Sequence, residues 1–209
     1  MRQFLDFEKP IAVLEGKIEE LRHLSTEGDI NIADEVGRLQ QKITKELTQA
    51  YSRLGPWEKV QVARHPDRPK ATTIIAELFT DFIPMAGDRN YREDHALFTG
   101  MARFRGRPVA VIATEKGQTT EDRIKRNFGM VRPEGYRKAR RLMELAGRFG
   151  LPVISLVDTA GAYPGRGAEE RGQAEAIARS IQACLNLQTP LISAIVGEGG
   201  SGGAIALAT

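Results

Sequence analysis

Two continuous apolar runs, Val153–Val157 and Leu191–Val196, constrain the fold more than any other feature of the sequence. Helical periodicity fills the chain between them, from Ala168 to Leu187. Apolar runs without alternation are typical of parallel strands buried on both faces of a sheet. A strand, helix, strand order makes a parallel crossover the default. The sequence therefore predicts an α/β architecture with a sheet that is buried on both faces.

The segment before these runs predicts further helices and a β-hairpin. Pro133 opens a helical pattern that Gly150 closes. A short turn at Arg105-Gly106-Arg107 separates two strand-like runs and predicts a hairpin, with Pro108 at the start or on the edge of its strand. The two runs are 96–104 and 109–114, and short helices are expected at 57–64 and 72–82. The last residues, 204–209, read as the first turns of an apolar helix that has no stop signal, and we expect the chain to be a fragment of a longer polypeptide.

Residues 10–54 carry an apolar stripe with spacings of three and four, which indicates helix. Gly28-Asp29 interrupts the stripe and Gly55-Pro56 ends it, so the pattern predicts two antiparallel helices that begin near Pro10. Such a hairpin needs a partner surface, either its own domain or another subunit, and the spacing favours neither. We expect two domains, a helical hairpin over 1–55 and an α/β domain over 56–209.

Composition narrows the class of protein. Charged residues make up 27% and hydrophobic residues 41% of the 209, which is typical of a folded globular chain. The lone Cys184 excludes an intrachain disulfide framework and a cysteine zinc site in this chain. No stretch approaches the roughly 20 apolar residues that span a bilayer. We therefore expect a cytoplasmic protein without a membrane partner.

The glycine cluster from Gly197 to Gly203 follows the second buried run and precedes a helix start. It satisfies G-x-G-x-x-G, but a dinucleotide site needs an acidic residue about 20 positions later, beyond the last residue here. It also satisfies the nucleophile elbow G-x-S-x-G around Ser201, yet all three histidines precede that serine, whereas hydrolases of this type place the histidine after it. No Lys-Ser or Lys-Thr pair follows the glycines, so a P-loop is excluded. A tight structural turn remains the simple alternative.

A further interpretation of the cluster uses only the backbone. Amides of Gly202 and Gly203 at a helix start would donate hydrogen bonds to an oxygen that gains negative charge. A second glycine-rich loop, Asp158–Gly165, follows the preceding strand. Because the carboxyl ends of parallel strands share one sheet edge, both loops are expected to face one site. Within this loop we favour Asp158 as a cap for neighbouring amides over a general base, and Tyr163 as a packing residue.

The segment from Glu115 to Arg141 concentrates positive charge. It holds nine basic residues against four acidic ones, whereas the whole chain has a formal net charge of only +3. A solvated helix face explains any single residue, but as a group these residues could hold the phosphates of a ligand or meet an acidic partner domain. Arg137, Arg140 and Arg141 are the candidate contacts. Nucleic acid is not a favoured partner, because no aromatic residues interleave with the basic ones.

Several motifs, in order along essentially the whole chain, resemble one family. They include DTAGAYPGRGAEERGQAEAIA (158–178), the run 196–206 containing GEGGSGGAIA, FLDFEKPIAVLEGKI (4–18), VARHP (62–66), KRNFGM (125–130) and PEGYRKARRLM (133–143). They are similar to the α subunit of the bacterial acetyl-CoA carboxylase carboxyltransferase. The resemblance implies a crotonase-like fold, a spiral of ββα units, and an α2β2 assembly.

The resemblance also implies a reaction, partners and site residues. The family moves a carboxyl group from carboxybiotin on the biotin carboxyl carrier protein to acetyl-CoA, giving malonyl-CoA for fatty-acid synthesis. Biotin carboxylase is a further partner, and zinc is expected only in the β subunit. Gly202 and Gly203 would form the oxyanion hole, and biotin would contact Gly161, Ala162, Gly199, Gly200 and Ser201. CoA or the carrier protein could contact Arg137, Arg140 and Arg141. Two alternatives stay open: a noncatalytic crotonase-like assembly module, and a crotonase-type acyl-CoA hydratase that acts alone.

Overall fold

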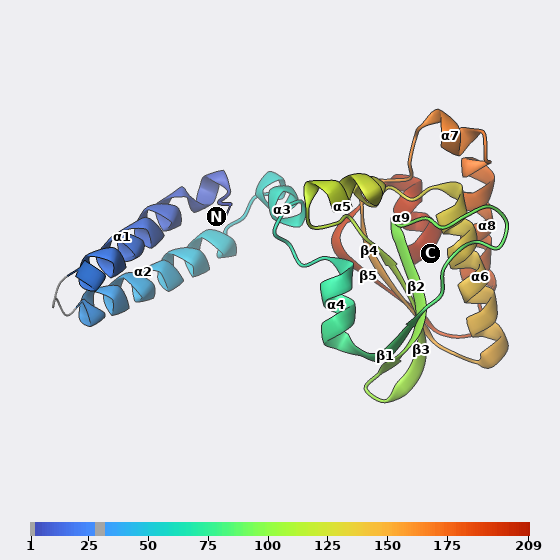
Figure 1. The fold of residues 1–209 in the computed structure, drawn as a ribbon, viewed down its shortest axis with the longest axis horizontal. Coiled ribbons are helices and arrows are strands. Elements are labelled where there is room, and N and C mark those ends of the chain that lie inside the picture. Colours follow the sequence, from blue (N-terminus) through green and yellow to red (C-terminus); the bar gives the residue numbers. More distant parts are fainter. Residues whose placement is uncertain (1–2, 28–31) are drawn as a thin grey trace. The chain divides into compact units, whose positions relative to one another are not determined.

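The structure, a computed structural model, describes residues 3–27 and 32–209 (Figure 1). The chain divides into two compact units, Met1–Asp67 and Arg68–Thr209. The first of these units extends past residue 55, where the sequence suggests a domain boundary, and includes the third helix. Within this unit, the ring nitrogen Nε2 of His65 makes a 2.8 Å hydrogen bond with the carbonyl oxygen of Gln3, which ties the end of the unit to its start.

The first unit is helical, as the apolar stripe predicts. It contains a short 3-10 turn at Asp6–Glu8 and the helices α1 (Lys9–Glu27), α2 (Ala33–Ser52) and α3 (Pro56–Ala63). α1 begins one residue before the expected Pro10, and the predicted break at Gly28-Asp29 lies outside the described residues. Ile11, Leu14 and Ile18 of α1 are buried. Across the hairpin, the hydroxyl of Tyr51 donates to the carboxylate of Glu8 at 2.8 Å.

The second unit is built on a five-stranded sheet whose strands lie in sequence order. β1 (Phe79–Pro84), β2 (Leu97–Phe104) and β3 (Arg107–Thr114) pair antiparallel, and β4 (Val153–Thr159) and β5 (Leu191–Gly199) continue the sheet in parallel. The predicted hairpin and parallel crossover are confirmed. Pro108 stands near the start of its strand, opposite Arg103. The turn between β2 and β3 contains Arg105 and Gly106, both at positive φ.

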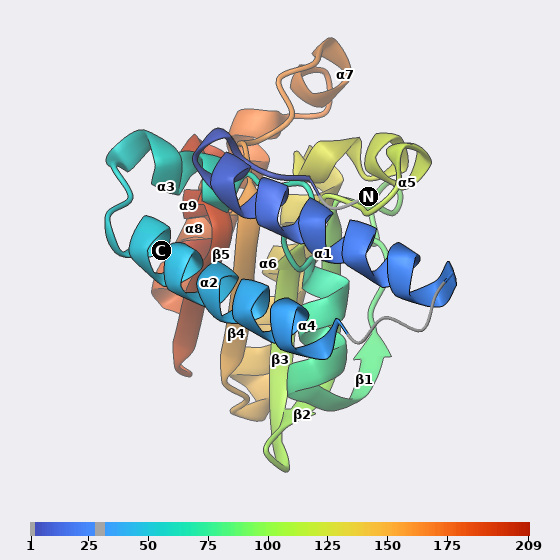
Figure 2. The same ribbon diagram turned by 90° about the vertical axis from the view of Figure 1, so that its left-hand side faces the viewer.

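Helices cover both faces of this sheet (Figure 2). α4 (Ala71–Leu78) packs on one face against Val111, Ala113 and Leu156. α6 (Pro133–Phe149), α8 (Gln173–Asn186) and α9 (Ser201–Ala208) cover the other. The shorter elements are α5 (Thr120–Lys125), a 3-10 turn at Asn127–Gly129, and α7 (Arg166–Glu169). Gly150 closes α6 in the left-handed conformation, as its position predicts.

Three local expectations are wrong. The segment expected as one helix over 72–82 ends at Leu78, and Phe79 begins strand β1. The helix expected over 168–187 is divided into α7 and α8, because Gly172 takes φ 78° between them. β5 was expected to be buried on both faces, yet it lies at the sheet edge with Ile192 and Ile195 exposed.

Candidate functional site

The two glycine-rich loops meet at the carboxyl ends of β4 and β5, as the sequence predicts. Thr159 at the end of β4 is in register with Gly199 at the end of β5. The amide of Gly200 donates to the carbonyl oxygen of Thr159 at 2.8 Å. A hydrogen bond of this length fixes one loop against the other. The residues expected to contact biotin therefore lie along one line of contact between the loops, which we call the seam: Gly161 and Ala162 on one side and Gly199–Gly203 on the other.

Gly203 lies against the other loop with no space for a side chain. A Cβ added to it would lie 2.5 Å from the carbonyl carbon of Gly161 and would overlap the amide nitrogen of Ala162. Gly200 is equally constrained, because its Cβ would lie 2.8 Å from the amide nitrogen of Gly161. Glycine at these two positions is therefore required by the close approach of backbone to backbone.

Gly202 and Gly203 occupy the first turn of α9, at the helix start that the sequence predicts. Amides of a first helical turn have no partner within the helix, and the helix dipole adds positive potential there. The first intrahelical bond closes one residue later, from the amide of Ala204 to the carbonyl of Gly200 at 3.1 Å. Ser201 is exposed at φ 51°, a left-handed conformation that turns the chain sharply from strand into helix. This geometry can stabilise an anionic oxygen without a catalytic side chain.

The side chains of Thr159 and Gln173 fix the loop that begins at Ala160. The hydroxyl of Thr159 donates to the carbonyl of Gly129 at 2.6 Å and accepts from the amide of Gly161 at 3.1 Å. The buried amide group of Gln173 donates to the carbonyl oxygens of Val131 and Tyr163, at 3.0 and 2.9 Å. These bonds tie the loop to the start of α6 and to α8. Sequence reasoning missed Gln173, whose only signal is a polar residue on the core-facing side of a helix.

Asp158 and Tyr163 take the supporting roles that the sequence favours. Asp158 accepts a hydrogen bond from the amide of Glu198 at 3.0 Å. Its Oδ1 atom also lies 2.7 Å from Nζ of Lys116, and that same nitrogen lies 2.7 Å from Oε1 of Glu198. The ring of Tyr163 lies beneath the guanidinium of Arg132, 4.3 Å from its carbon to the ring centroid. Both side chains therefore contact neighbouring residues of the chain.

A buried ionic network supports the start of α6. Glu134 is fully buried, and its carboxylate pairs with Arg171 at 3.0 Å and with Arg92 at 3.4 Å. Burial alone raises the pKa of Glu134, but the hydrogen bonds from Arg171 and Arg92 outweigh it and hold that pKa below its ordinary value. Nearby, burial lowers the pKa of Lys138, although Glu93 opposes this effect by pairing with it.

The three candidate basic contacts on α6 all have partners within the chain. Arg137 pairs with the buried Asp88 at 2.8 Å. Arg141 donates to the carbonyl oxygens of Ala86 and Gly87, at 3.3 and 3.2 Å. Arg140 pairs with Glu144 of its own helix at 3.3 Å. Contact of these arginines with CoA or a carrier stays a prediction.

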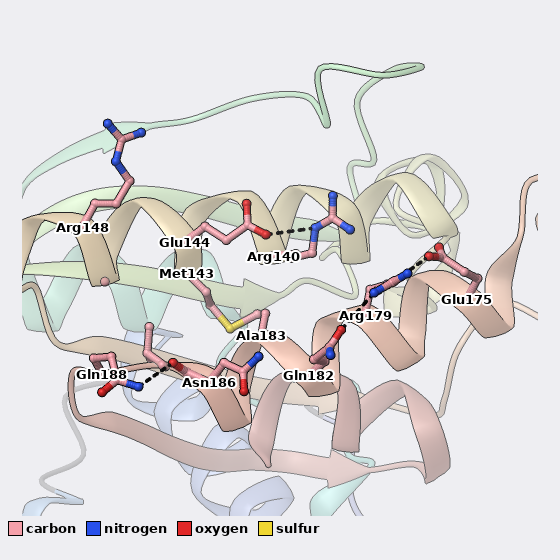
Figure 3. A pocket seen from close by; sticks show the side chains of 12 residues that line it. Arg140, Met143, Glu144, Arg148, Glu175, Arg179, Gln182, Ala183, Asn186 and Gln188 are labelled. Atoms are coloured by element: carbon pink, nitrogen blue, oxygen red, sulfur yellow. Dashed lines mark hydrogen bonds and ion pairs between the residues drawn. The ribbon is translucent and has the colours of Figure 1, made fainter.

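Arg140 also lines a groove of about 640 Å³ between α6 and α8 (Figure 3). Met143 and Ala183 contribute apolar surface to it, and Arg179 pairs with Glu175 at its rim at 3.0 Å. No residue of the two glycine-rich loops lines this groove. The groove and the backbone site are therefore separate features of the second unit.

The described residues were compared with the patterns of membrane-spanning helices and of metal sites. Within 3–27 and 32–209, no helix is long and apolar enough to cross a membrane. In the same ranges, no three His, Cys, Asp or Glu side chains gather where they could hold a metal ion.

Comparison with curated proteins gives close relatives. Acetyl-coenzyme A carboxylase carboxyl transferase subunit alpha of Paramagnetospirillum magneticum is 65% identical over 205 residues, covering 98% of this chain and 65% of the relative. The protein of the same name from Acidiphilium cryptum is 64% identical over 208 residues, covering 100% of this chain and 65% of the relative. The chain thus spans about 65% of the length of these relatives.

Solved structures support the fold. A single-chain, multi-domain long-chain acyl-CoA carboxylase is 26% identical with a TM-score of 0.57, covering 71% of this chain and 14% of the larger one. Transcarboxylase 12S, solved with methylmalonyl-coenzyme A bound, is 23% identical with a TM-score of 0.55, covering 64% and 24%. These similarities confirm the crotonase-like α/β fold class.

A model of one protein family matches almost the whole sequence. The match covers residues 4–209, which include the N-terminal hairpin and both glycine-rich loops. It agrees with the motifs that suggested this family from the sequence. The chain belongs to the acetyl co-enzyme A carboxylase carboxyltransferase-like family.

Proposed function

We propose that this chain provides the α-subunit part of an acetyl-CoA carboxylase carboxyltransferase. In this proposal it helps to move a carboxyl group from carboxybiotin, carried on the biotin carboxyl carrier protein, to acetyl-CoA, giving malonyl-CoA. The observation that carries the proposal is the seam between the two loops, where the first turn of α9 packs on Gly161 and Ala162. Family membership and the 65% identity to a relative named as this α subunit support it, although the chain spans only 65% of that relative.

The chemistry suits a site made of backbone. When carbon dioxide leaves carboxybiotin, the electron pair of the broken N–C bond stays on the ureido group, and negative charge develops on its oxygen. Amides of Gly202 and Gly203 would donate to that oxygen, and a preorganised donor of this kind contributes about 3 kcal/mol at the transition state. The biotin nitrogen then accepts a proton from the methyl group of acetyl-CoA, and the resulting carbanion attacks carbon dioxide. Binding and positioning of the two substrates supply the remainder of the rate acceleration.

The partners follow from the same proposal. We infer an α2β2 assembly in which a β subunit carries zinc and binds acetyl-CoA, with biotin carboxylase supplying carboxybiotin on the carrier. The hairpin of the first unit would then be available for a subunit contact. The cytoplasmic location stays a prediction from the sequence.

A reconstitution experiment tests the proposal. The α chain, the β subunit and their mixture are each assayed for carboxyl transfer from malonyl-CoA to free biotin. We expect activity only in the mixture. Activity of the α chain alone with an enoyl-CoA would instead support the hydratase alternative, and an inactive mixture that still assembles would support the noncatalytic module.

A further inference from the structure

Three charged side chains join the ends of three neighbouring strands beside the glycine seam. Lys116 follows β3, Asp158 lies near the end of β4, and Glu198 lies near the end of β5. The ammonium nitrogen of Lys116 lies 2.7 Å from Oδ1 of Asp158 and 2.7 Å from Oε1 of Glu198. The side chains are 19%, 7% and 17% exposed, so solvent screens these pairs only partly.

The backbone around this cluster is shaped to fit it. The amide of Glu198 donates to the same Oδ1 atom of Asp158 at 3.0 Å. The amide of Asp158 donates to the hydroxyl of Thr114 at 2.6 Å, which links β4 to β3. A Cβ on Gly197 would overlap the Asp158 carboxylate. The carboxylate is thus fixed directly against β5, two residues before the chain leaves β4 at Ala160.

Removing the ammonium group of Lys116 removes the cation that contacts both carboxylates, although the nearby Lys70 still attracts Asp158. Both carboxylate oxygens contact one nitrogen, so they are separated by at most about twice the contact distance. Like charges this close in a largely buried position oppose each other. The force would separate β4 from β5 at their carboxyl ends, where the amide of Gly200 must stay 2.8 Å from the carbonyl of Thr159.

We propose that Lys116 is a positioning residue for the backbone site. By holding Asp158 against Glu198, it keeps the Gly199–Gly203 turn in the position from which the amides of α9 meet the reacting oxygen. This inference rests on the proposed function, since it assigns a role within that same site. Lys116 itself does not contact the reacting atoms.

The test compares variants of the α chain assembled with its β subunit. We expect Lys116→Met to lower kcat about 100-fold, as small misplacements of catalytic groups do, and to leave KM for malonyl-CoA within about twofold. Lys125→Met is the matched control, because it removes the same charge from an exposed position on the neighbouring α5. The proposal is overturned if the kcat of Lys116→Met stays within about threefold of wild type. It is also overturned if KM rises by the same factor as kcat falls, or if Lys125→Met loses as much kcat as Lys116→Met.

A double variant tests the repulsion directly. Adding Glu198→Gln to Lys116→Met removes one of the opposed charges, so we expect it to restore kcat at least about tenfold. A double variant no more active than Lys116→Met overturns the proposal. If Lys116→Met does not assemble, Lys116→Arg takes its place, with kcat expected within about tenfold of wild type. A folded, assembled but inactive Lys116→Arg would be contrary to the proposal.

Hydrogen exchange separates failure of this inference from failure of the proposed function. Amide exchange of the peptide spanning Gly199–Ala204 is measured by mass spectrometry in wild type, Lys116→Met and Lys125→Met. We expect about tenfold faster exchange in Lys116→Met alone. An inactive wild-type complex would refute the proposed function, whereas unchanged exchange in Lys116→Met would refute the positioning role.

Discussion

Gly203 and Ala162 are packed backbone to backbone, with no room between them for a single added carbon atom. They belong to loops that follow different strands, β5 and β4. The contact therefore depends on the parallel pairing of these strands and on the absence of a side chain at one position. Both conditions can be tested.

Substitution of Gly203 should abolish carboxyl transfer. Gly203→Val, and also Gly203→Ala, place a Cβ in the backbone of the opposite loop, so the α9 amides must shift away from the reacting oxygen. We expect kcat to fall at least about 100-fold, while the complex with the β subunit still assembles in size-exclusion chromatography. Gly147→Ala is the matched control, because it is another helical glycine, and its Cβ would lie 3.6 Å from Leu187. Wild-type rates in Gly203→Val would contradict the assignment of the site.

Loss of Gln173 should free the loop that holds Gly161 and Ala162. Gln173→Ala leaves the buried carbonyl of Val131 and the partly buried carbonyl of Tyr163 without this donor, and we expect the free energy of unfolding to fall by about 2 kcal/mol. Gln182→Ala, at an exposed position of the same helix, should change it by less than about 0.5 kcal/mol. Urea unfolding followed by circular dichroism measures both values. Equal effects of the two substitutions would argue against a specific role of Gln173.

Acid should destabilise the second unit through Glu134. The pKa of Glu134 is lowered in the folded chain, so its contribution is fully present above the unfolded pKa, about 4.3, and is lost as the pH falls below that value. Asp88 adds to this trend: burial raises its pKa, but hydrogen bonds from the Tyr91 amide and from Arg137 outweigh burial and lower it.

The variant Glu134→Gln tests this pH dependence. At neutral pH we expect it to cost about 3 kcal/mol, because Arg171 loses a buried ionic partner. Its Tm should then fall less steeply than that of wild type between pH 5 and pH 3. Glu144→Gln, at an exposed position of the same helix, should follow the wild-type profile. Parallel profiles of wild type and Glu134→Gln would show that another group governs the acid transition.

The basic face of α6 gives a prediction about the carrier protein. Arg140→Glu should raise KM for the carrier protein roughly fivefold if the groove between α6 and α8 meets an acidic partner. Arg166→Glu is the control, since Arg166 forms a similar pair with Glu170 one helical turn away. Equal shifts in both variants would indicate a response to net charge alone. Arg141 is less suitable for this substitution, because its side chain donates to the carbonyl oxygen of Gly87 and so holds the chain before Asp88.

Much of the second unit could be predicted because its signals are local. Gly150 ends α6 through a left-handed residue, and the β2–β3 hairpin follows from a two-residue turn between apolar runs. The end of α4 was missed because apolar residues near Phe79 fit both helical and strand periodicity. The break before α8 depends on the φ of Gly172, which helical spacing does not reveal.

The candidate site also has features that the sequence predicts and features that it does not. The meeting of the two loops follows from parallel strands, so Gly161 and Gly203 could be placed together before the structure was known. The contacts of Lys116 could not, because they depend on the relative register of three strands separated by long connections. Burial of β5 was overestimated for a related reason: apolar composition does not show which strand lies at an edge.

The position of β5 has a practical consequence for handling this polypeptide. An edge strand with isoleucines exposed at Ile192 and Ile195 is a template on which further strands can add. The side chain of Arg68 covers one of its carbonyl groups, that of Val196, but a single cation is a small barrier to self-association. In concentrated solution, copies of this chain should therefore aggregate first along β5, and a lysine in place of Ile195 should keep them dispersed.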